Sequence, residues 1–325
     1  MTFPKTRLRR LRYNKAVRDL VEDTNLRPKD LIYPVFVSDN LKSKKEIISM
    51  PGQYQIPLNL LNDICDKILS NGIKSIFLFG VPAKKDEHGL VAQSDDGIVQ
   101  KAIKIIKKNY PDILIIADLC NCQYTNHGHC GTIVDNDVDN DLTLKNLGLQ
   151  ALSLVRSGAD IIAPSDMMDG RVGYLRNILD KNNFIKTPIF SYCIKYSSSF
   201  YGPFREAAEN TPEFGDRRSY QMNFKNSFEA LREAETDINE GADVLIIKPA
   251  LSYLDIIYKV KSKFSIPVIA FNVSGEYSMV KSASDRNWID GANAAIEILT
   301  SMKRAGASAI VTYHALEIAK KLNKN

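Results

Sequence analysis

Residues 241–250 read GADVLIIKPA, and this short stretch contains the pattern that indicates the fold. Gly241 comes first, an apolar run from Val244 to Ile247 follows, and Lys248 comes directly after the run. The run is continuously apolar and does not alternate with polar residues, so it predicts a strand that is buried on both faces, as in a parallel sheet. Glycine suits the left-handed conformation in which a helix ends before such a strand.

Eight apolar runs of this kind are spaced along the chain. They cover residues 31–37, 75–81, 113–119, 159–165, 188–194, 243–249, 267–273 and 308–314. Helical stretches lie between them, as in residues 58–72, where apolar residues recur every three or four positions along one face. The motif GAD or GAS repeats at the helix-to-strand turns, at residues 158–160, 241–243 and 306–308.

Eight strand-and-helix units within about 290 residues predict an α/β protein with the (β/α)8 TIM-barrel fold. A doubly wound open sheet is the main alternative, but such a sheet usually carries a glycine-rich phosphate loop after an early strand, and the sequence has none there. We predict a single catalytic barrel domain over residues 31–325 and an extended N-terminal arm for subunit contacts over residues 1–30.

The composition argues against several classes of protein. The 325 residues are 44% hydrophobic and 25% charged, which is typical of a soluble globular protein. The longest apolar runs have the length of strands, so we expect no membrane span. The net charge of +5 is spread along the chain, which argues against nucleic-acid binding and is compatible with anionic small molecules. Five cysteines in so long a chain do not indicate a disulfide framework.

The N-terminal stretch MTFPKTRLRRLRYN is basic but lacks the apolar core of a signal peptide, so we expect a cytoplasmic protein. An arginine-rich start is also found in transit peptides and in nucleic-acid-binding arms. We favour an arm that packs on another subunit or lies in solvent.

In a TIM barrel the catalytic groups lie at the C-terminal ends of the strands, which meet at one rim. The reactive side chains at those ends are Asp118 and Cys120, Ser165 and Asp166, Lys195, Lys248, Ser274, and Tyr313. Six different strands therefore bring reactive side chains to the same rim.

Two of these side chains are lysines that follow buried strands, Lys195 and Lys248. A lysine among apolar groups or beside a second cation loses its proton more easily, and the free amine can then attack a ketone to form a Schiff base. The alternative for each is a lysine at a strand exit whose amine reaches solvent. Two such lysines on neighbouring strands strengthen the catalytic interpretation, because each would lower the pKa of the other, and both interpretations stay open from the residues alone.

The stretch 112–131, DILIIADLCNCQYTNHGHCG, contains three of the five cysteines, namely Cys120, Cys122 and Cys130. Their spacing does not match a zinc finger, and three thiolates leave one tetrahedral position of a zinc ion open for water or substrate. Such an open site is typical of catalytic zinc. The alternative is a structural zinc whose fourth ligand is His127 or His129.

Residues 196–225 interrupt the strand-and-helix rhythm, and loops of that length inside a compact domain are usually functional. The segment holds Phe200, Tyr201, Phe204, Arg205, Arg217, Arg218 and Gln221. Aromatic side chains can bury a lid, and arginines bind carboxylates through paired hydrogen bonds, so we predict an active-site lid. A solvated basic loop is the alternative. The combined pattern predicts a substrate that carries a ketone and a carboxylate.

Several motifs, in the same order along the chain, resemble those of the porphobilinogen synthase (5-aminolaevulinate dehydratase) family. They are YTNHGHCG, VDNDLTL, APSDMMDGRV, YGPFREAAE, FGDRRSYQM, KPALSYLDII and VSGEYSMVK, and the similarity covers nearly the whole chain. The resemblance implies a lyase that condenses two molecules of 5-aminolaevulinate to porphobilinogen, with loss of two waters, on the route to haem and other tetrapyrroles.

The resemblance also implies roles for individual residues. Lys195 and Lys248 would each hold a substrate as a Schiff base, and Asp118 and Ser165 would lie near the amine or the proton transfers. Cys120, Cys122 and Cys130 match the zinc-dependent branch of the family and would bind a catalytic zinc. Arg205, Arg217 and Gln221 would bind one substrate carboxylate, and Ser274 and Tyr313 the other.

Family members form octamers through the N-terminal arm, and many bacterial members bind an allosteric magnesium near a glutamate that aligns with Glu233. The chain departs from common family residues at Asn121, Gln123, Phe271 and His314. Two other functions remain open from the sequence. One is a class I aldolase-type barrel that uses a Schiff base without metal, and the other is a non-catalytic scaffold with a structural zinc.

Overall fold

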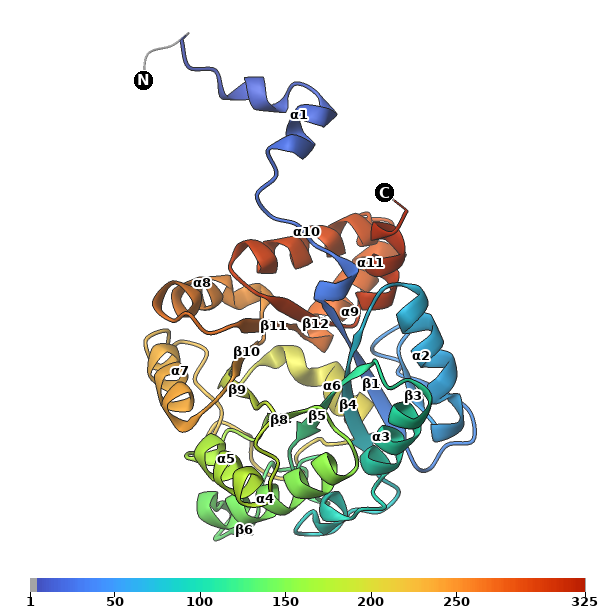
Figure 1. The fold of residues 1–325 in the computed structure, drawn as a ribbon, viewed down its shortest axis with the longest axis vertical. Coiled ribbons are helices and arrows are strands. Elements are labelled where there is room, and N and C mark those ends of the chain that lie inside the picture. The colour runs from blue at the N-terminus through green and yellow to red at the C-terminus, as the bar shows by residue number, and fades with distance from the viewer. Residues whose placement is uncertain (1–4, 325) are drawn as a thin grey trace.

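A computed structural model describes residues 5–324, and in it eight parallel strands form a TIM barrel, as predicted (Figure 1). The barrel strands are β1 (Leu31–Ser38), β4 (Ser75–Val81), β5 (Leu114–Leu119), β8 (Ile161–Pro164), β9 (Phe190–Lys195), β10 (Val244–Lys248), β11 (Val268–Asn272) and β12 (Ala309–Thr312). Each of the eight predicted apolar runs overlaps one of these strands, with ends that differ by up to two residues.

The strands pair in the order in which they occur along the chain. The first and last strands of the barrel are neighbours, with Leu31 opposite Ile310. Between β8 and β9 the ring closes through a single parallel bridge that joins Ile162 to Ile189. A doubly wound sheet would leave two open edges, so this closure excludes the alternative fold.

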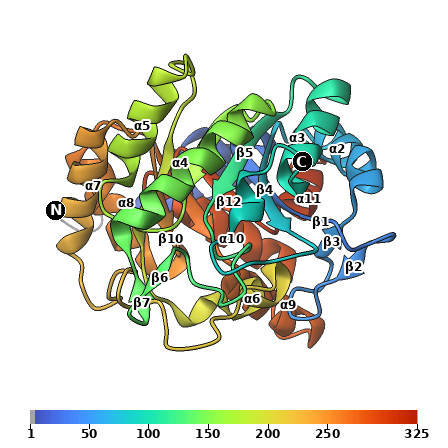
Figure 2. The same cartoon turned by 90° about the horizontal axis from the view of Figure 1, so that it is seen from below.

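Helices surround the barrel on the outside (Figures 1 and 2). They are α2 (Leu61–Ser70), α3 (Ile98–Asn109), α4 (Asn140–Arg156), α5 (Arg171–Lys181), α7 (Glu229–Glu240), α8 (Leu254–Lys263), α9 (Ser274–Asp285), α10 (Gly291–Arg304) and α11 (Ala315–Leu322). Gly241, in the stretch 241–250, has a φ of 103°, which is the left-handed conformation expected for a glycine that ends a helix before a strand.

Two apolar layers make up the core. The outer layer lies between the strands and the helices and includes Val35, Leu78 and Ile247. The inner layer fills the barrel and contains a group of packed aromatic rings, namely Phe36, Phe77, Phe79, Tyr192 and Phe271. Each strand therefore contacts apolar groups on both faces, which explains its continuously apolar sequence.

The connections between these main elements contain short strands and 3-10 turns. They are the paired strands β2 (Lys45–Glu46) and β3 (Tyr54–Ile56), the hairpin of β6 (Ile133–Val134) and β7 (Asp137–Val138), and the 3-10 turns η2 (Pro28–Asp30), η3 (Leu58–Leu60), η4 (Leu90–Gln93) and η6 (Leu251–Tyr253). The segment 196–225 contains η5 (Ser199–Tyr201) and α6 (Gly202–Ala208). Helix α6 packs against α9 and β4 at one end of the barrel (Figure 2).

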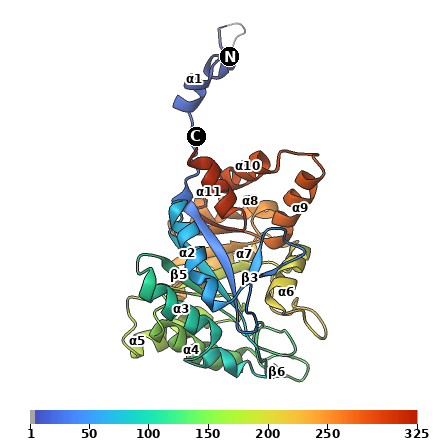
Figure 3. The same cartoon turned by 90° about the vertical axis from the view of Figure 1, so that its right-hand side faces the viewer.

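The N-terminal residues extend away from the barrel as a separate arm (Figures 1 and 3). Within the described residues the arm contains η1 (Leu8–Arg12) and α1 (Lys15–Leu20), and neither element has a buried residue. Leu8 is 72% exposed and Leu20 is 83% exposed. Among residues 5–324, no helix combines the length and the apolar character that a membrane crossing requires.

A buried ion pair joins two outer helices to the barrel. Arg171 of α5 donates to Asp237 of α7 at 3.0 Å, and both side chains are at most 3% exposed. Arg171 also donates to the hydroxyl of Ser191 and to the carbonyl of Tyr192, both on β9. Breaking such a pair on one side leaves an uncompensated buried charge, which costs far more than breaking a pair on the surface.

We therefore expect Asp237→Ala to lower the free energy of unfolding by about 3–5 kcal/mol, because Arg171 would remain buried without its counter-ion. The matched control is Asp255→Ala, which removes a carboxylate that is 61% exposed and lies 3.8 Å from Lys259. That control should cost at most about 1 kcal/mol. Urea denaturation followed by circular dichroism measures both values, and similar losses in the two variants would contradict this role of the buried pair.

Candidate active site

A cavity at the C-terminal ends of the strands brings together many of the predicted site residues. Its lining consists of Phe79, Asp118, Cys122, Gln123, Ser165, Lys195, Tyr201, Phe204, Arg205, Arg217 and Lys248. These residues come from the strands β4, β5, β9 and β10, from the loops after β5 and β8, and from the segment 196–225. The cavity measures about 20 Å³, which is room for roughly one water molecule.

Lys248 lies at the end of β10 among aromatic rings. Its Nζ atom is 4.3 Å from the ring centre of Phe271, 4.6 Å from that of Phe204, 5.3 Å from that of Tyr201 and 5.4 Å from that of Tyr192. Burial, together with the positive charge of Lys195, lowers the pKa of Lys248 to about 7. A large fraction of this amine is therefore neutral near pH 7, as a nucleophile requires.

Lys195 ends β9 and lies beside Lys248, because the two residues are register partners in the paired strands. A bulge in β9 makes this possible. Leu245 is opposite Ser191, but two residues later Ile247 is opposite Ile194, so β9 contains one extra residue. The Nζ atom of Lys195 donates a hydrogen bond to the backbone carbonyl of Ser165.

Asp118 shares the cavity with both lysines and is held by Gln123. The Nε2 atom of Gln123 donates to Asp118 Oδ2 at 2.9 Å, and its Oε1 atom accepts from the backbone N–H of Gly80 at 3.0 Å. Burial raises the pKa of Asp118 to about 6, although the positive charges of Lys248 and Lys195 oppose the shift. The sequence marked Gln123 only as a departure from the family, and its contact with Asp118 was not predicted.

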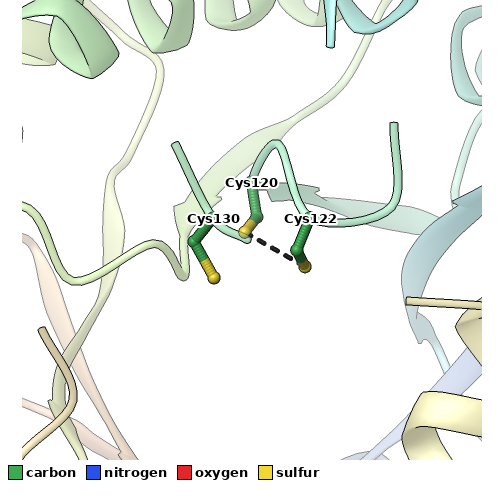
Figure 4. A group of neighbouring side chains, drawn as sticks. All are labelled: Cys120, Cys122 and Cys130. Carbon is green, nitrogen blue, oxygen red and sulfur yellow. Dashed lines mark hydrogen bonds between the residues drawn. The ribbon is translucent and has the colours of Figure 1, made fainter. Parts of the chain in front are cut away.

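The three cysteines of the loop after β5 converge (Figure 4). Their sulfur atoms all lie within 4.8 Å of one another, the Cys120 and Cys122 sulfurs are 3.3 Å apart, and all three residues are buried. Sulfur ligands at about 2.3 Å from a tetrahedral zinc lie roughly 3.8 Å apart, so the trio fits such an ion. Among residues 5–324, this is the only group of three or more His, Cys, Asp or Glu side chains whose ligand atoms lie close enough together to hold one metal ion.

The two histidines of the loop, His127 and His129, make hydrogen bonds to groups other than the cysteine sulfurs. His127 contacts the carbonyl of Glu87 through Nε2 at 3.0 Å and accepts from the N–H of His129 through Nδ1. The ring of His129 contacts the carbonyl of Phe214 at 3.0 Å and the hydroxyl of Tyr220 at 3.1 Å. Since both nitrogens of each ring already have partners, this geometry favours an open three-thiolate site over a structural zinc closed by a histidine.

Arg217 is buried, which excludes a solvated loop at this position. It is 7% exposed, and its Nη2 atom donates to the carbonyls of Gly128 and Asn210, each at 2.7 Å. Arg205 is half-buried in the same cavity, and the Nε atoms of both arginines lack hydrogen-bond partners among the described residues. Two converging guanidinium groups with free donors suit an anionic ligand.

Three predicted substrate-binding residues lie outside this cavity. Gln221 is buried beside the neighbouring cavity that Glu233 also lines. Ser274 Oγ accepts from the backbone N–H of Phe204 at 3.0 Å, so it contacts α6. The hydroxyl of Tyr313 is buried and has no hydrogen-bond partner within the described part of the chain.

Glu233 is half-buried on α7 and lines a separate cavity of about 410 Å³ together with Asp169 and Glu229. Burial raises the pKa of Glu233 to about 7, with Arg171 opposing the shift and the carboxylates of Asp237 and Asp169 adding to it. With three carboxylates against one guanidinium, that of Arg218, the lining of this cavity is acidic on balance, and the cavity is distinct from the one that holds the lysines.

The other three residues that depart from the family pattern, Phe271, His314 and Asn121, are all buried. Phe271 contributes the ring that lies nearest to the Lys248 amine, so its missing hydroxyl leaves that side of the amine apolar. His314 is buried, and neither ring nitrogen has a hydrogen-bond partner in the described chain, although Nδ1 lies 3.8 Å from a Glu317 carboxylate oxygen. Asn121 is buried, and its carbonyl accepts from the N–H groups of Tyr124 and Thr125.

Comparison with known proteins agrees with this geometry. A family model described as delta-aminolevulinic acid dehydratase matches residues 5–321. Curated proteins of that name are 53% identical in Bacillus subtilis, over 97% of both chains, and 52% identical in Staphylococcus aureus, over 98% of this chain and 99% of the relative.

A solved structure is also similar over nearly the whole chain. It is delta-aminolevulinic acid dehydratase (porphobilinogen synthase) from Toxoplasma gondii in complex with the reaction product porphobilinogen. It superposes with a TM-score of 0.95 at 42% identity, covering 97% of this chain and 91% of the other. The chain therefore belongs to the delta-aminolevulinic acid dehydratase family.

Proposed function

We propose that the chain catalyses the condensation of two molecules of 5-aminolaevulinate to porphobilinogen, with loss of two waters, as a lyase of tetrapyrrole biosynthesis. One observation carries the proposal: Lys195 and Lys248 are register partners at the mouth of one barrel and share a cavity with Asp118 and Cys122. Two amines side by side suit a reaction in which two ketone substrates are held at once.

Lys248 has the environment of a Schiff-base lysine. Its neutral amine attacks the ketone carbon of one substrate and forms a C–N bond. After proton transfers, the former carbonyl oxygen leaves as water and the C=N bond is complete. Asp118 lies in the same cavity and is assigned to these proton transfers, with Ser165 near the substrate amine. Lys195 would hold the other substrate in the same way.

The substrate carboxylates need separate partners. We assign one carboxylate to Arg205 and Arg217, whose Nε donors have no partners among the described residues, with Gln221 as a further donor. Ser274 and Tyr313 are assigned to the other carboxylate. They lie outside the cavity when α6 is packed down, so reaching them requires α6 to move.

The segment 196–225 is proposed to be a lid. The cavity of about 20 Å³ is far too small for two substrates while Phe204 and Arg205 line it. Movement of α6 would open the site, and its return would exclude water from the reacting groups.

We propose that Cys120, Cys122 and Cys130 hold a zinc ion, a set of soft ligands that suits zinc better than magnesium. A zinc ion bound there would supply a Lewis acid beside the second substrate. The nearby Arg217 side chain contributes positive charge that, together with the ion, compensates the thiolates.

Three further assignments concern the whole assembly. We propose a homo-octamer whose arm, residues 1–30, contacts another subunit, supported by the exposed leucines Leu8 and Leu20. We also propose an allosteric magnesium at Glu233, supported by the acidic cavity around it, because magnesium prefers oxygen ligands. Cytoplasmic location and the absence of nucleic-acid and membrane partners remain predictions from the sequence.

Reductive trapping tests the Schiff base. With 5-aminolaevulinate and cyanoborohydride, the adduct should map to Lys248 by peptide mass, and its initial rate should rise about tenfold per pH unit up to roughly pH 7 and then level off. Protonated Lys248 cannot attack, which fixes this direction. Lys248→Ala should lose that adduct and turnover, whereas Lys259→Ala, a change on the surface, should keep both. Turnover by a folded Lys248→Ala protein would refute the assignment.

Metal analysis tests the cysteine set. Cys122→Ala should lose zinc and most activity, because two thiolates bind the ion poorly, whereas Cys65→Ala, which lies outside the trio, should retain the metal. Wild-type activity should disappear with a strong chelator and return with zinc. Activity that resists chelation would instead support the metal-free, aldolase-type alternative, and a protein that binds zinc without any turnover would support the scaffold.

The arginines should separate substrate affinity from stability. Arg205→Ala should raise the KM roughly 10- to 150-fold, the equivalent of losing a charge-assisted hydrogen bond of about 1.5–3 kcal/mol, with an almost unchanged melting temperature. Arg217→Ala should raise the KM and also lower the melting temperature, because its Nη2 bonds to Gly128 and Asn210 are buried. Steady-state kinetics and calorimetry measure both effects. An unchanged KM in both variants would remove the arginines from the carboxylate site.

A further inference from the structure

The lid and the cysteine loop are joined by a set of buried contacts. Hydrogen bonds run from the lid to the cysteine loop. The Nδ2 atom of Asn210 donates to Cys122 Sγ at 3.1 Å, and the Nη2 atom of Arg217 donates to the Gly128 carbonyl at 2.7 Å. The backbone N–H of Glu213 donates to the His127 carbonyl at 3.1 Å. His129 contacts the lid through Phe214 and Tyr220. Closing the lid therefore assembles the surroundings of the thiolates, in addition to covering the lysines.

Among these lid residues, Asn210 is the one whose side chain donates a hydrogen bond to a cysteine sulfur. It is 1% exposed and follows α6 by two positions. Its backbone N–H donates to the carbonyl of Arg205 at 3.2 Å, and its carbonyl accepts from Arg217 at 2.7 Å. With the backbone fixed on both sides, the amide is aimed at Cys122.

Only the nitrogen end of the Asn210 side-chain amide has a hydrogen-bond partner among the described residues. Its Oδ1 atom is buried and has no hydrogen-bond partner in the described chain. An asparagine that served only to hold the lid together would have both ends of its amide paired, since an unpaired buried oxygen is costly. The donor end is the one that is satisfied, and its acceptor is a sulfur of the proposed zinc site.

We propose that Asn210 is a positioning residue that couples lid closure to the zinc site by donating a hydrogen bond to the Cys122 thiolate. The inference rests on the zinc site and the lid of the proposed function. A hydrogen bond from outside the ligand set orients a thiolate and stabilises its negative charge, and removing such partners typically weakens metal binding 10- to 100-fold.

The coupling runs in both directions. Because Asn210 lies two residues after the helix that carries Phe204 and Arg205, opening α6 would withdraw the amide from Cys122. If the closed lid strengthens zinc binding, then zinc must favour the closed lid by the same factor. The metal site is thus fully supported only when the substrate cavity is closed.

The test compares two variants with a matched control in the full-length protein. Asn210→Ala removes the amide, and Asn210→Leu removes the donor while keeping the number and branching of the side-chain heavy atoms, which guards against a cavity being the cause of any change. Asn223→Ala is the control, because Asn223 is an exposed lid asparagine whose side chain accepts from the N–H of Lys225. Zinc affinity is measured by competition with a chromophoric chelator, and cobalt(II) replaces zinc to report on the thiolate ligands by absorption.

Both Asn210 variants should bind zinc about 10- to 100-fold more weakly and shift the thiolate-to-cobalt absorption band, and Asn223→Ala should match the wild type. Hydrogen exchange of residues 200–221 should slow on zinc addition in the wild type and change little in the Asn210 variants. Folded variants with wild-type zinc affinity and an unchanged cobalt band would overturn the proposal, even if their lids exchange faster. If Cys122→Ala binds zinc as tightly as the wild type, the zinc site itself is wrong, and this inference fails with it.

Discussion

Strand β9 pairs with β10 in a register that places Lys195 beside Lys248, and this pairing depends on one extra residue in β9. Tyr192 belongs to the core inside the barrel, whereas Cys193 and Ile194 both belong to the outer layer. Two successive residues on the same face mark the bulge, and Lys195 then returns to the inside. A regular strand would have sent Lys195 to the outer face, because a shift of one residue exchanges the two faces of a strand.

Once both lysines share the cavity, the surrounding groups determine their chemistry. Aromatic rings remove water from Lys248 and thereby favour its neutral form, and the nearby charge of Lys195 acts in the same direction. Arg217 lines the same cavity, and burial works against its charge, but the negative charge of the Cys130 and Cys122 sulfurs raises its pKa above the usual value. One small cavity therefore holds an amine whose neutral form is favoured and a guanidinium whose charged form is favoured.

The segment 196–225 links these regions to the outside of the barrel. Glu206 of α6 accepts from the backbone N–H groups of Ile48 and Ser49 at 3.0 and 3.2 Å, and Gln55 of β3 donates to the Ala207 carbonyl at 2.9 Å. Further contacts reach the cysteine loop and Ser274. Helix α6 and the two residues after it thus contact the loop between β2 and β3, strand β3, the lysine cavity and Cys122. Movement of this segment therefore alters all of these environments together.

The sequence by itself determined the barrel, because strands buried on both faces must be continuously apolar and helices that cover them must be amphipathic. It also predicted the two lysines and the three cysteines as site residues, from their positions at strand ends or in the loop after a strand. The bulge, the hold of Gln123 on Asp118, the burial of Arg217 and the contact between Asn210 and Cys122 were decided only by the tertiary structure. These features depend on strand register and on contacts between loops far apart in the chain, and local periodicity reports burial but neither register nor partners.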